Sequence, residues 1–270
     1  MPDYTAILAE MVATARAAGA LTQGYFARFR ELEIGIKGPA DFVSEADMES
    51  EKLIRQRLFD AYPAWSFTGE EFAPVTGSDP EHTWLVDPID GTTNFINGMH
   101  YTISIALRRG NETVCGALYN PVSDEMFTAI KGQGAFLNGT RLTVSSQADT
   151  GLLTVGTGLP TSGLHSFAGF YDRLERLREP IGAVRVVGSS ANSCAYVACG
   201  RLTGYFEETG FVDTAAGILI VEEAGGIVTD WWGRGPEVFE KTGTLIVANP
   251  ATHAFLLYQL RDVPPKDPRT

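Results

Sequence analysis

One stretch decides the fold, Trp84-Leu85-Val86-Asp87-Pro88-Ile89-Asp90-Gly91-Thr92-Thr93-Asn94-Phe95. Its apolar start predicts a short strand that delivers Asp87 to its end, where Pro88 stiffens the turn. Asp90 follows closely enough for the two carboxylates to share one cation. Gly91 and Thr92 could open a short helix whose free N–H groups bind an anion, and the Thr92 hydroxyl could bond an attacking water. The stretch therefore indicates a site for divalent cations and a phosphate, although Asp-Pro and Asp-Gly pairs also form ordinary turns.

Three further acidic residues lie in contexts that fit the same chemistry. Glu70 follows an aromatic, strand-like run at 65–67, and its carboxylate is a ligand type that Mg²⁺ prefers, although such a Glu is often a solvated loop residue. Asp213 precedes an apolar helical run, where an N-cap role would also explain it. Asp47 closes a capping box that begins at Ser44, and it could assist a water-positioning hydroxyl.

The first half of the chain predicts two helices followed by antiparallel strands. Apolar residues recur with helical spacing in the first segments, and apolar runs bounded by turn residues follow. The predicted helices cover 4–29 and 44–62, and the predicted strands cover 83–86, 101–107, 113–119 and 125–130. Because only short turns separate the later strands, they pair as antiparallel neighbours, which argues against a doubly wound parallel sheet.

Strands and helices alternate after about residue 150. The predicted strands cover 152–156, 184–187, 203–207, 226–229 and 243–248, and the predicted helices cover 166–178, 190–199, 213–224 and 250–261. The whole pattern indicates the α+β class with two layered subdomains. Residues 1–145 form an N-terminal α+β subdomain with most of the candidate metal ligands, residues 146–262 form a C-terminal α/β subdomain with Asp213, and residues 263–270 form a frayed tail.

Composition limits the classes of partner and compartment. The 270 residues carry 21 Lys+Arg and 33 Asp+Glu, a formal charge of −12, with no basic cluster for a nucleic acid or an anionic membrane. The three cysteines are an odd number without a CxxC motif, which favours a reducing compartment over a disulfide scaffold. The start of the chain lacks the pattern of a signal peptide, and no long apolar run occurs, so we expect a cytoplasmic protein. Zinc motifs of the HExxH type and a GxSxG nucleophile elbow do not occur.

Taken together, the acidic motifs resemble those of the inositol monophosphatase family. The order and approximate spacing match in Gly69-Glu70-Glu71, in the stretch from Asp87 to Phe95, and in Asp213 before Ala215-Ala216-Gly217 and Glu223-Ala224-Gly225-Gly226. Lys37 near Asp41 and the hairpin at 131–136 add to the match, which covers roughly residues 5–260. The resemblance implies a layered αβαβα sandwich, dependence on two or three Mg²⁺ ions, inhibition by lithium and a homodimer.

The resemblance also implies a role for each matching residue. Glu70, Asp87 and the Ile89 carbonyl would bind the first metal ion, and Asp87, Asp90 and Asp213 the second. A third, weaker ion would lie near Glu70, which would also take part in catalysis. Thr92 and Asp47 would help to activate the water, and the N–H groups of Gly91 and Thr92 would bind the phosphate. Lys37 is a further candidate, and the substrate would meet Asp90, Gly188, Ser189, Ser190, Glu207 and Asp213.

The implied activity is hydrolysis of a small polyol or sugar phosphate, with inositol 1-phosphate as the first candidate. Histidinol phosphate, fructose 1,6-bisphosphate, NADP and a 3′-phosphonucleotide are alternative substrates. The presence of Thr at position 93 favours the inositol-type branch of the family. Three departures touch the substrate side: Val212 stands where the family usually has Trp, the stretch from Glu207 to Asp213 is one residue shorter, and residues 188–191 read Gly-Ser-Ser-Ala. A non-catalytic regulatory or binding protein on the same scaffold is the alternative from another class.

Overall fold

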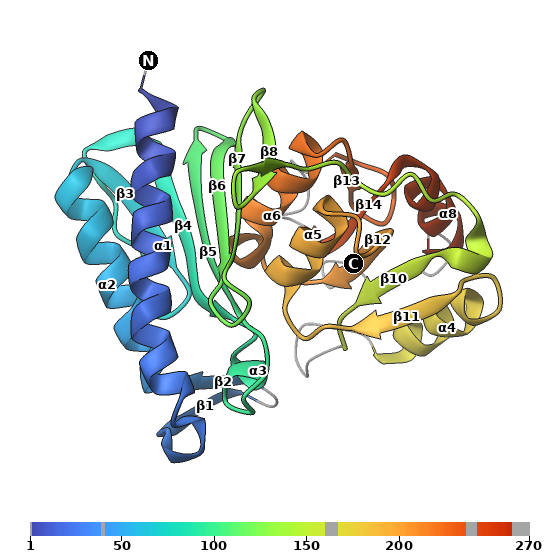
Figure 1. Ribbon diagram of the computed structural model, residues 1–270, viewed down its shortest axis with the longest axis horizontal. Helices are drawn as coiled ribbons and strands as arrows, with labels where there is room; N and C mark the ends of the chain where they lie inside the picture. The colour runs from blue at the N-terminus through green and yellow to red at the C-terminus, as the bar shows by residue number, and fades with distance from the viewer. Residues whose placement is uncertain (1, 39–40, 160–166, 236–241, 261–270) are drawn as a thin grey trace.

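Two large sheets and a small hairpin organise the molecule (Figure 1). The structure, a computed structural model, describes residues 2–38, 41–159, 167–235 and 242–260. Residues 166 and 261, at the ends of two predicted helices, and the predicted tail at 263–270 lie outside that range. Among the described residues, none of the helices is both long and apolar enough to cross a membrane.

The larger sheet has seven strands, and all but one of its neighbouring pairs are antiparallel. Strand β3 is parallel to β4, and every later strand pairs with the one before it, as the short turns predict. The strands are β3 (Trp65–Gly69), β4 (Asp79–Asp90), β5 (Thr102–Arg109), β6 (Glu112–Asn120), β7 (Glu125–Ile130), β8 (Gly134–Leu137) and β9 (Thr140–Arg141).

The smaller sheet has five strands in the order β11-β10-β12-β14-β13. Strand β10 is parallel to both of its neighbours, whereas β14 runs antiparallel between β12 and β13. The strands are β10 (Thr154–Thr157), β11 (Ala183–Val186), β12 (Gly204–Glu208), β13 (Ile227–Thr229) and β14 (Thr244–Ala248). A separate antiparallel hairpin joins β1 (Ile34–Gly38) to β2 (Asp41–Ser44).

Helices form three layers around these sheets (Figure 1). Helices α1 (Tyr4–Phe26) and α2 (Glu45–Ala61) cover the outer face of the larger sheet. Helices α5 (Ser190–Ala198) and α6 (Phe211–Glu223) lie between the two sheets, and α4 (Phe167–Arg178) and α8 (Pro250–Leu260) cover the outer face of the smaller one. The expected αβαβα sandwich is therefore confirmed.

Small residues allow the central layer to pack tightly. A Cβ on Gly217 of α6 would lie 2.6 Å from the Cβ of Cys194 in α5, and a Cβ on Gly116 of β6 would lie 3.0 Å from the carbonyl oxygen of Ala216. Helix α6 is buried continuously from Thr214 to Val221. A helix that is apolar on all sides belongs in the middle of a layered fold, and this position fixes where its first turn lies.

Several predicted boundaries were wrong in informative ways. The first helix ends at Phe26 and a 3₁₀ turn follows at Phe29–Glu31, whereas β4 begins at 79 and continues through the predicted turn to Asp90. Helix α6 begins at Phe211 with Gly210 at its N-cap, so the N-cap role for Asp213 is wrong and this acid lies in the first turn. The division near residue 145 stays a prediction.

Candidate functional site

A β-bulge places both acids of the decisive stretch on one face of the larger sheet. Asp87 pairs with Ser104 of β5 and Asp90 pairs with Thr102, so the two residues between the acids on β4 oppose one residue on β5. Simple alternation would put Asp87 and Asp90 on opposite faces, but the extra residue restores them to the same face. Pro88, which has no N–H to donate, occupies the bulge.

Glu70 joins this face because β3 and β4 are parallel. Gly69 pairs with Val86, so the residues that follow, Glu70 and Asp87, are neighbours at the point where β3 ends. Asp213 arrives from the first turn of α6. Ligand oxygens of Glu70, Asp87 and Asp213 all lie within 4.8 Å of one another. These three acids, from three elements, form the acidic cluster of the site.

The electrostatics of the acidic cluster favour a bound cation. Burial raises the pKa of Asp87 well above its usual value, and the negative charges of Glu70, Asp90 and Asp213 raise it further. Burial, with the charges of Glu70 and Asp90, raises the pKa of Asp213 to about 7. Several oxygen donors with unfavourable mutual repulsion fit a hard divalent ion such as Mg²⁺ or Mn²⁺.

Asp90 faces the N-terminus of α5 and lies beside the cluster. Its Oδ1 accepts from the N–H of Ser190 at 3.2 Å, and its Oδ2 accepts from the N–H of Ala191 at 2.8 Å and from the hydroxyl of Ser189. Burial raises the pKa of Asp90 to about 7 although these bonds oppose the rise. Asp90 thus connects the larger sheet to the segment at 189–191.

Thr92 and Asp47 form a hydrogen-bonded pair that joins α3 (Thr92–Phe95) to α2. The Thr92 hydroxyl lies 3.0 Å from Oδ1 of Asp47 and 3.2 Å from the carbonyl oxygen of Ile89. Oδ2 of Asp47 accepts from the N–H and the hydroxyl of Ser44, which confirms the capping box. Burial raises the pKa of Asp47, and the bonds from Ser44 and Thr92 oppose that rise. When Thr92 donates to Asp47, its oxygen is left to accept a hydrogen bond from a water.

Gly91 has a backbone that only glycine adopts easily. Its φ is 94°, it stands at the N-cap of the short helix α3 (Thr92–Phe95), and a Cβ there would lie 2.8 Å from the carbonyl oxygen of Gly188. The predicted short helix is confirmed. The close approach brings Gly91 and Gly188, distant in sequence, to the same place.

Glu207 also lies at the site, despite the short segment that follows it. The Ser190 hydroxyl is 3.3 Å from Oε2 of Glu207 and 3.0 Å from the hydroxyl of Thr209, and Tyr205 donates to Glu207. The Thr209 hydroxyl is in turn 3.5 Å from Oδ2 of Asp213. Lys37 lies on β1, but its side chain lies outside the described part of the structure.

Sequence reasoning gave no role to two residues that hold the site together. Asn94, within the quoted stretch, donates to the carbonyl oxygens of Val187 at 2.8 Å and His100 at 3.0 Å. Glu51 is fully buried in α2, where burial raises its pKa and backbone N–H groups of residues 70–72 oppose the rise. The sequence could have indicated Glu51, because it is a charged residue on the buried face of its helix. No sequence pattern indicates the role of Asn94.

Two cavities lie outside the acidic cluster. One, of about 460 Å³, is bounded by Thr68 and Leu85 of the larger sheet, Arg108 of β5, and Phe211 and Val212 at the start of α6.

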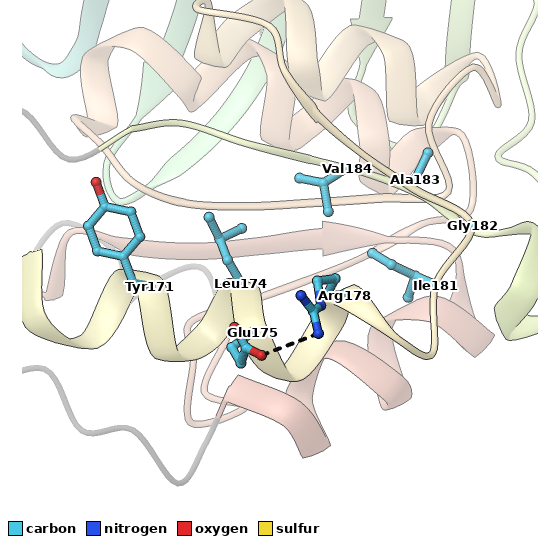
Figure 2. Close-up of a pocket in the computed structure, with 8 residues that line it drawn as sticks. All are labelled: Tyr171, Leu174, Glu175, Arg178, Ile181, Gly182, Ala183 and Val184. Atoms are coloured by element: carbon cyan, nitrogen blue, oxygen red, sulfur yellow. Dashed lines mark ion pairs between the residues drawn. The ribbon is translucent and has the colours of Figure 1, made fainter.

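The second cavity, of about 470 Å³, lies between α4 and β11 (Figure 2). Its apolar lining includes Leu174, Ile181 and Val184, and an ion pair of 3.6 Å joins Glu175 to Arg178 at its rim.

Comparison with known proteins agrees with this geometry. A model described as "Inositol monophosphatase family" matches residues 3–264. The chain belongs to the inositol monophosphatase family. Membership makes it a phosphatase that hydrolyses phosphomonoesters of small metabolites.

Relatives within the family carry two kinds of name. An inositol-1-monophosphatase of Rhizobium meliloti is 39% identical over 91% of this chain and 92% of its own length. The Nus factor SuhB of Escherichia coli K12 is 37% identical over 93% and 94%. A crystal structure of the extragenic suppressor protein suhB from Bartonella henselae has a TM-score of 0.91 and 37% identity, covering 95% of this chain and 98% of that one.

Proposed function

We propose that this phosphatase depends on Mg²⁺ and hydrolyses a small polyol phosphate, with inositol 1-phosphate as the first candidate. The observation that carries the proposal is the acidic cluster beside the Thr92–Asp47 pair. Hydrolysis of a phosphate monoester needs both charge neutralisation and an activated water, and these two features address one need each.

The donor set fits two or three ions of this kind. Glu70, Asp87 and the Ile89 carbonyl would hold the first ion, and Asp87, Asp90 and Asp213 the second, with a weaker third ion near Glu70. When bound, Mg²⁺ would supply the positive charge that offsets the phosphoryl and leaving oxygens and would lower the pKa of a water. The raised pKa values of Asp87, Asp90 and Asp213 support this, because a cation removes the repulsion that causes part of them.

The protein's own groups would orient and deprotonate the water. The buried Asp47 accepts the Thr92 proton, so that the Thr92 oxygen accepts a hydrogen bond from the attacking water and orients it. Proton movement then runs from the water toward Thr92 as Thr92 hands its own proton to Asp47. Glu70, at the edge of the cluster, would accept a further hydrogen bond from water.

The phosphate and the alcohol would bind at neighbouring positions beside Asp90. The N–H groups of Gly91 and Thr92 begin a helical turn and would bind phosphate oxygens. The alcohol hydroxyls would meet Asp90, Glu207, Asp213 and the turn that contains Gly188, Ser189 and Ser190. Glu207→Gln should therefore change KM or the preference among substrates; an unchanged profile would remove Glu207 from substrate binding.

The decisive experiment is phosphate release from a panel of phosphomonoesters with Mg²⁺, with EDTA, and with Mg²⁺ plus lithium. The panel holds inositol 1-phosphate, histidinol phosphate, fructose 1,6-bisphosphate, NADP and adenosine 3′,5′-bisphosphate. We expect Mg²⁺-dependent, lithium-sensitive release from inositol 1-phosphate. Release that persists in EDTA would refute the metal-dependent mechanism, and preference for another member would replace the substrate.

A regulatory or binding role is a second candidate, because a relative of 37% identity is named Nus factor SuhB. All four acids expected to bind metal are present, which favours catalysis. No release from any panel member would favour the binding role. The three cysteines are free, as is typical of a reducing compartment, and cytoplasmic location stays a prediction.

We also propose a homodimer, with the face formed by α4 and β11 as its contact. Strand β11 is an edge strand of the smaller sheet, and its Val186 is exposed. Tyr171 of α4, which lines the apolar cavity, is exposed as well (Figure 2). An exposed edge strand flanked by apolar side chains is typical of a surface that pairs with another chain. Light scattering on the native protein and on Val186→Lys tests this, and a native monomer would refute it.

A further inference from the structure

A buried carboxylate behind the acidic cluster holds the turn that carries Glu70. Glu51, fully buried in α2, accepts from the N–H of Glu71 at 2.7 Å through Oε2 and from the N–H of Phe72 at 3.2 Å through Oε1. Both donors belong to the turn in which β3 ends and the chain changes direction. The carboxylate thus binds the two residues that follow Glu70, whereas β3 lies directly before it.

The other end of the turn is fitted to the same carboxylate. A Cβ on Gly69 would lie 2.2 Å from Oε1 and 2.3 Å from Cδ of Glu51. The carboxylate therefore occupies the space that a side chain at position 69 would need. Gly69 is also the last residue of β3 and pairs with Val86. Glu70 is therefore held between a strand pairing on one side and two charge-assisted bonds on the other.

We infer that Glu51 is a positioning residue for the metal site, acting through the backbone of residues 69–72 to direct Glu70 toward Asp87 and Asp213. The inference rests on the proposed metal dependence. A ligand on a turn keeps its geometry only if the turn is fixed, and outer groups that orient ligands affect metal affinity by about 10- to 100-fold. Glu51 itself lies behind the turn and has no place in the proposed ligand set.

The chain offers a matched control at a different turn. Glu223, at the end of α6, accepts from the N–H of Gly132 at 2.7 Å and the N–H of Gly134 at 2.6 Å. It holds the turn between β7 and β8 with the same chemistry, but that turn carries none of the acids of the cluster. Glu223→Gln therefore shows what the loss of a carboxylate-held turn does in general.

The test is direct binding of Mn²⁺, measured on the full chain by the electron paramagnetic resonance signal of the free ion, with folding checked by circular dichroism. In Glu51→Gln the new amide N–H₂ faces backbone N–H donors, so we expect Mn²⁺ affinity to fall at least tenfold, with Glu223→Gln within twofold of the native protein. If Glu51→Gln does not fold, Glu51→Asp keeps the charge but is too short to reach both N–H groups, and the same loss is expected.

The outcomes separate this inference from the proposed function. Native-like Mn²⁺ binding by Glu51→Gln, or by a folded Glu51→Asp, alongside loss of binding by Asp87→Asn, would overturn the role of Glu51 and leave the metal site intact. An equal loss in Glu51→Gln and Glu223→Gln would also overturn it, because the effect would then be general loosening. Native-like binding by Asp87→Asn would refute the proposed metal site, and the inference with it.

Discussion

Asn94 connects two parts of the site that are far apart in sequence, and its removal should be measurable in both stability and binding. The side chain is 6% exposed, and its amide group donates to the carbonyl oxygens of Val187 and His100. Asn94→Leu keeps a similar volume but removes both donors. Each lost bond costs about 1 kcal/mol net, and up to about 3 kcal/mol where the acceptor stays buried and unpaired.

Val187 is half-buried and His100 is exposed, so water can reach the freed carbonyl groups and the cost per bond lies near the lower value. The two bonds together should then lower the free energy of unfolding by about 2 to 3 kcal/mol. For a chain of this size, about 1 kcal/mol shifts Tm by roughly 2–4 °C, which gives a decrease of about 5–10 °C. KM should rise as well, because the carbonyl of Val187 precedes the turn that contains Gly188 and Ser189.

Calorimetry and phosphate-release kinetics at saturating Mg²⁺ measure the two effects. The control is Asn97→Leu, since Asn97 donates to the carbonyl oxygen of Thr93 at 2.8 Å but is exposed. Exposed substitutions of this kind cost within about 0.5 kcal/mol. If Asn94→Leu matches this control in both Tm and KM, the bond to Val187 does not hold the turn, and the reasoning fails.

Three more predictions follow from the acids and their partners. Asp87→Asn should reduce kcat by orders of magnitude in the phosphate-release assay while Tm in EDTA stays equal or rises, because one member of a repelling group is lost; near-native turnover would contradict this. Thr92→Val should reduce kcat by about 10²- to 10⁴-fold, with Thr92→Ser restoring most of it, since only the hydroxyl orients the water; an inactive Thr92→Ser would show that the methyl group matters instead. In EDTA, Tm should fall as the pH rises from about 4 to about 7. The pKa of Asp213 is about 7 in the folded protein and near 4 in the unfolded chain, so the folded protein holds this proton more tightly. The stability that comes from the tighter binding of the proton is complete below about pH 4 and is lost as the pH rises to about 7. Asp213→Asn should show a smaller fall over the same range, and an identical fall would assign it to other groups.

The parts of the site that local pattern controls were predictable. An apolar run ending in Asp87 does form a strand, and the capping box at Ser44 and Asp47 forms as expected. The helical turn after Gly91 also forms where its residues indicate.

The parts that depend on distant pairing were not predictable. The bulge arises from the register of β4 against β5, and no local pattern in the quoted stretch specifies it. One of the two partners of Asn94, Val187, lies 93 residues away. Asp213 looked like an N-cap because it precedes an apolar run, but the helix starts earlier, at Phe211, whose side chain packs against the core between the two sheets.

Because it includes Asp213, the acidic cluster joins residues from the first and second halves of the chain. Glu70 and Asp87 come from paired strands of the larger sheet, whereas Asp213 comes from a helix that also packs against the smaller sheet. Any opening that separates the layers takes the cluster apart, so an ion held there resists the opening by mass action, by about 1.4 kcal/mol for each tenfold excess over its Kd. Hydrogen exchange across the buried part of α6 should therefore slow as the concentration of the divalent ion rises. The ion that serves the reaction would then also stabilise the packing of the layers against each other.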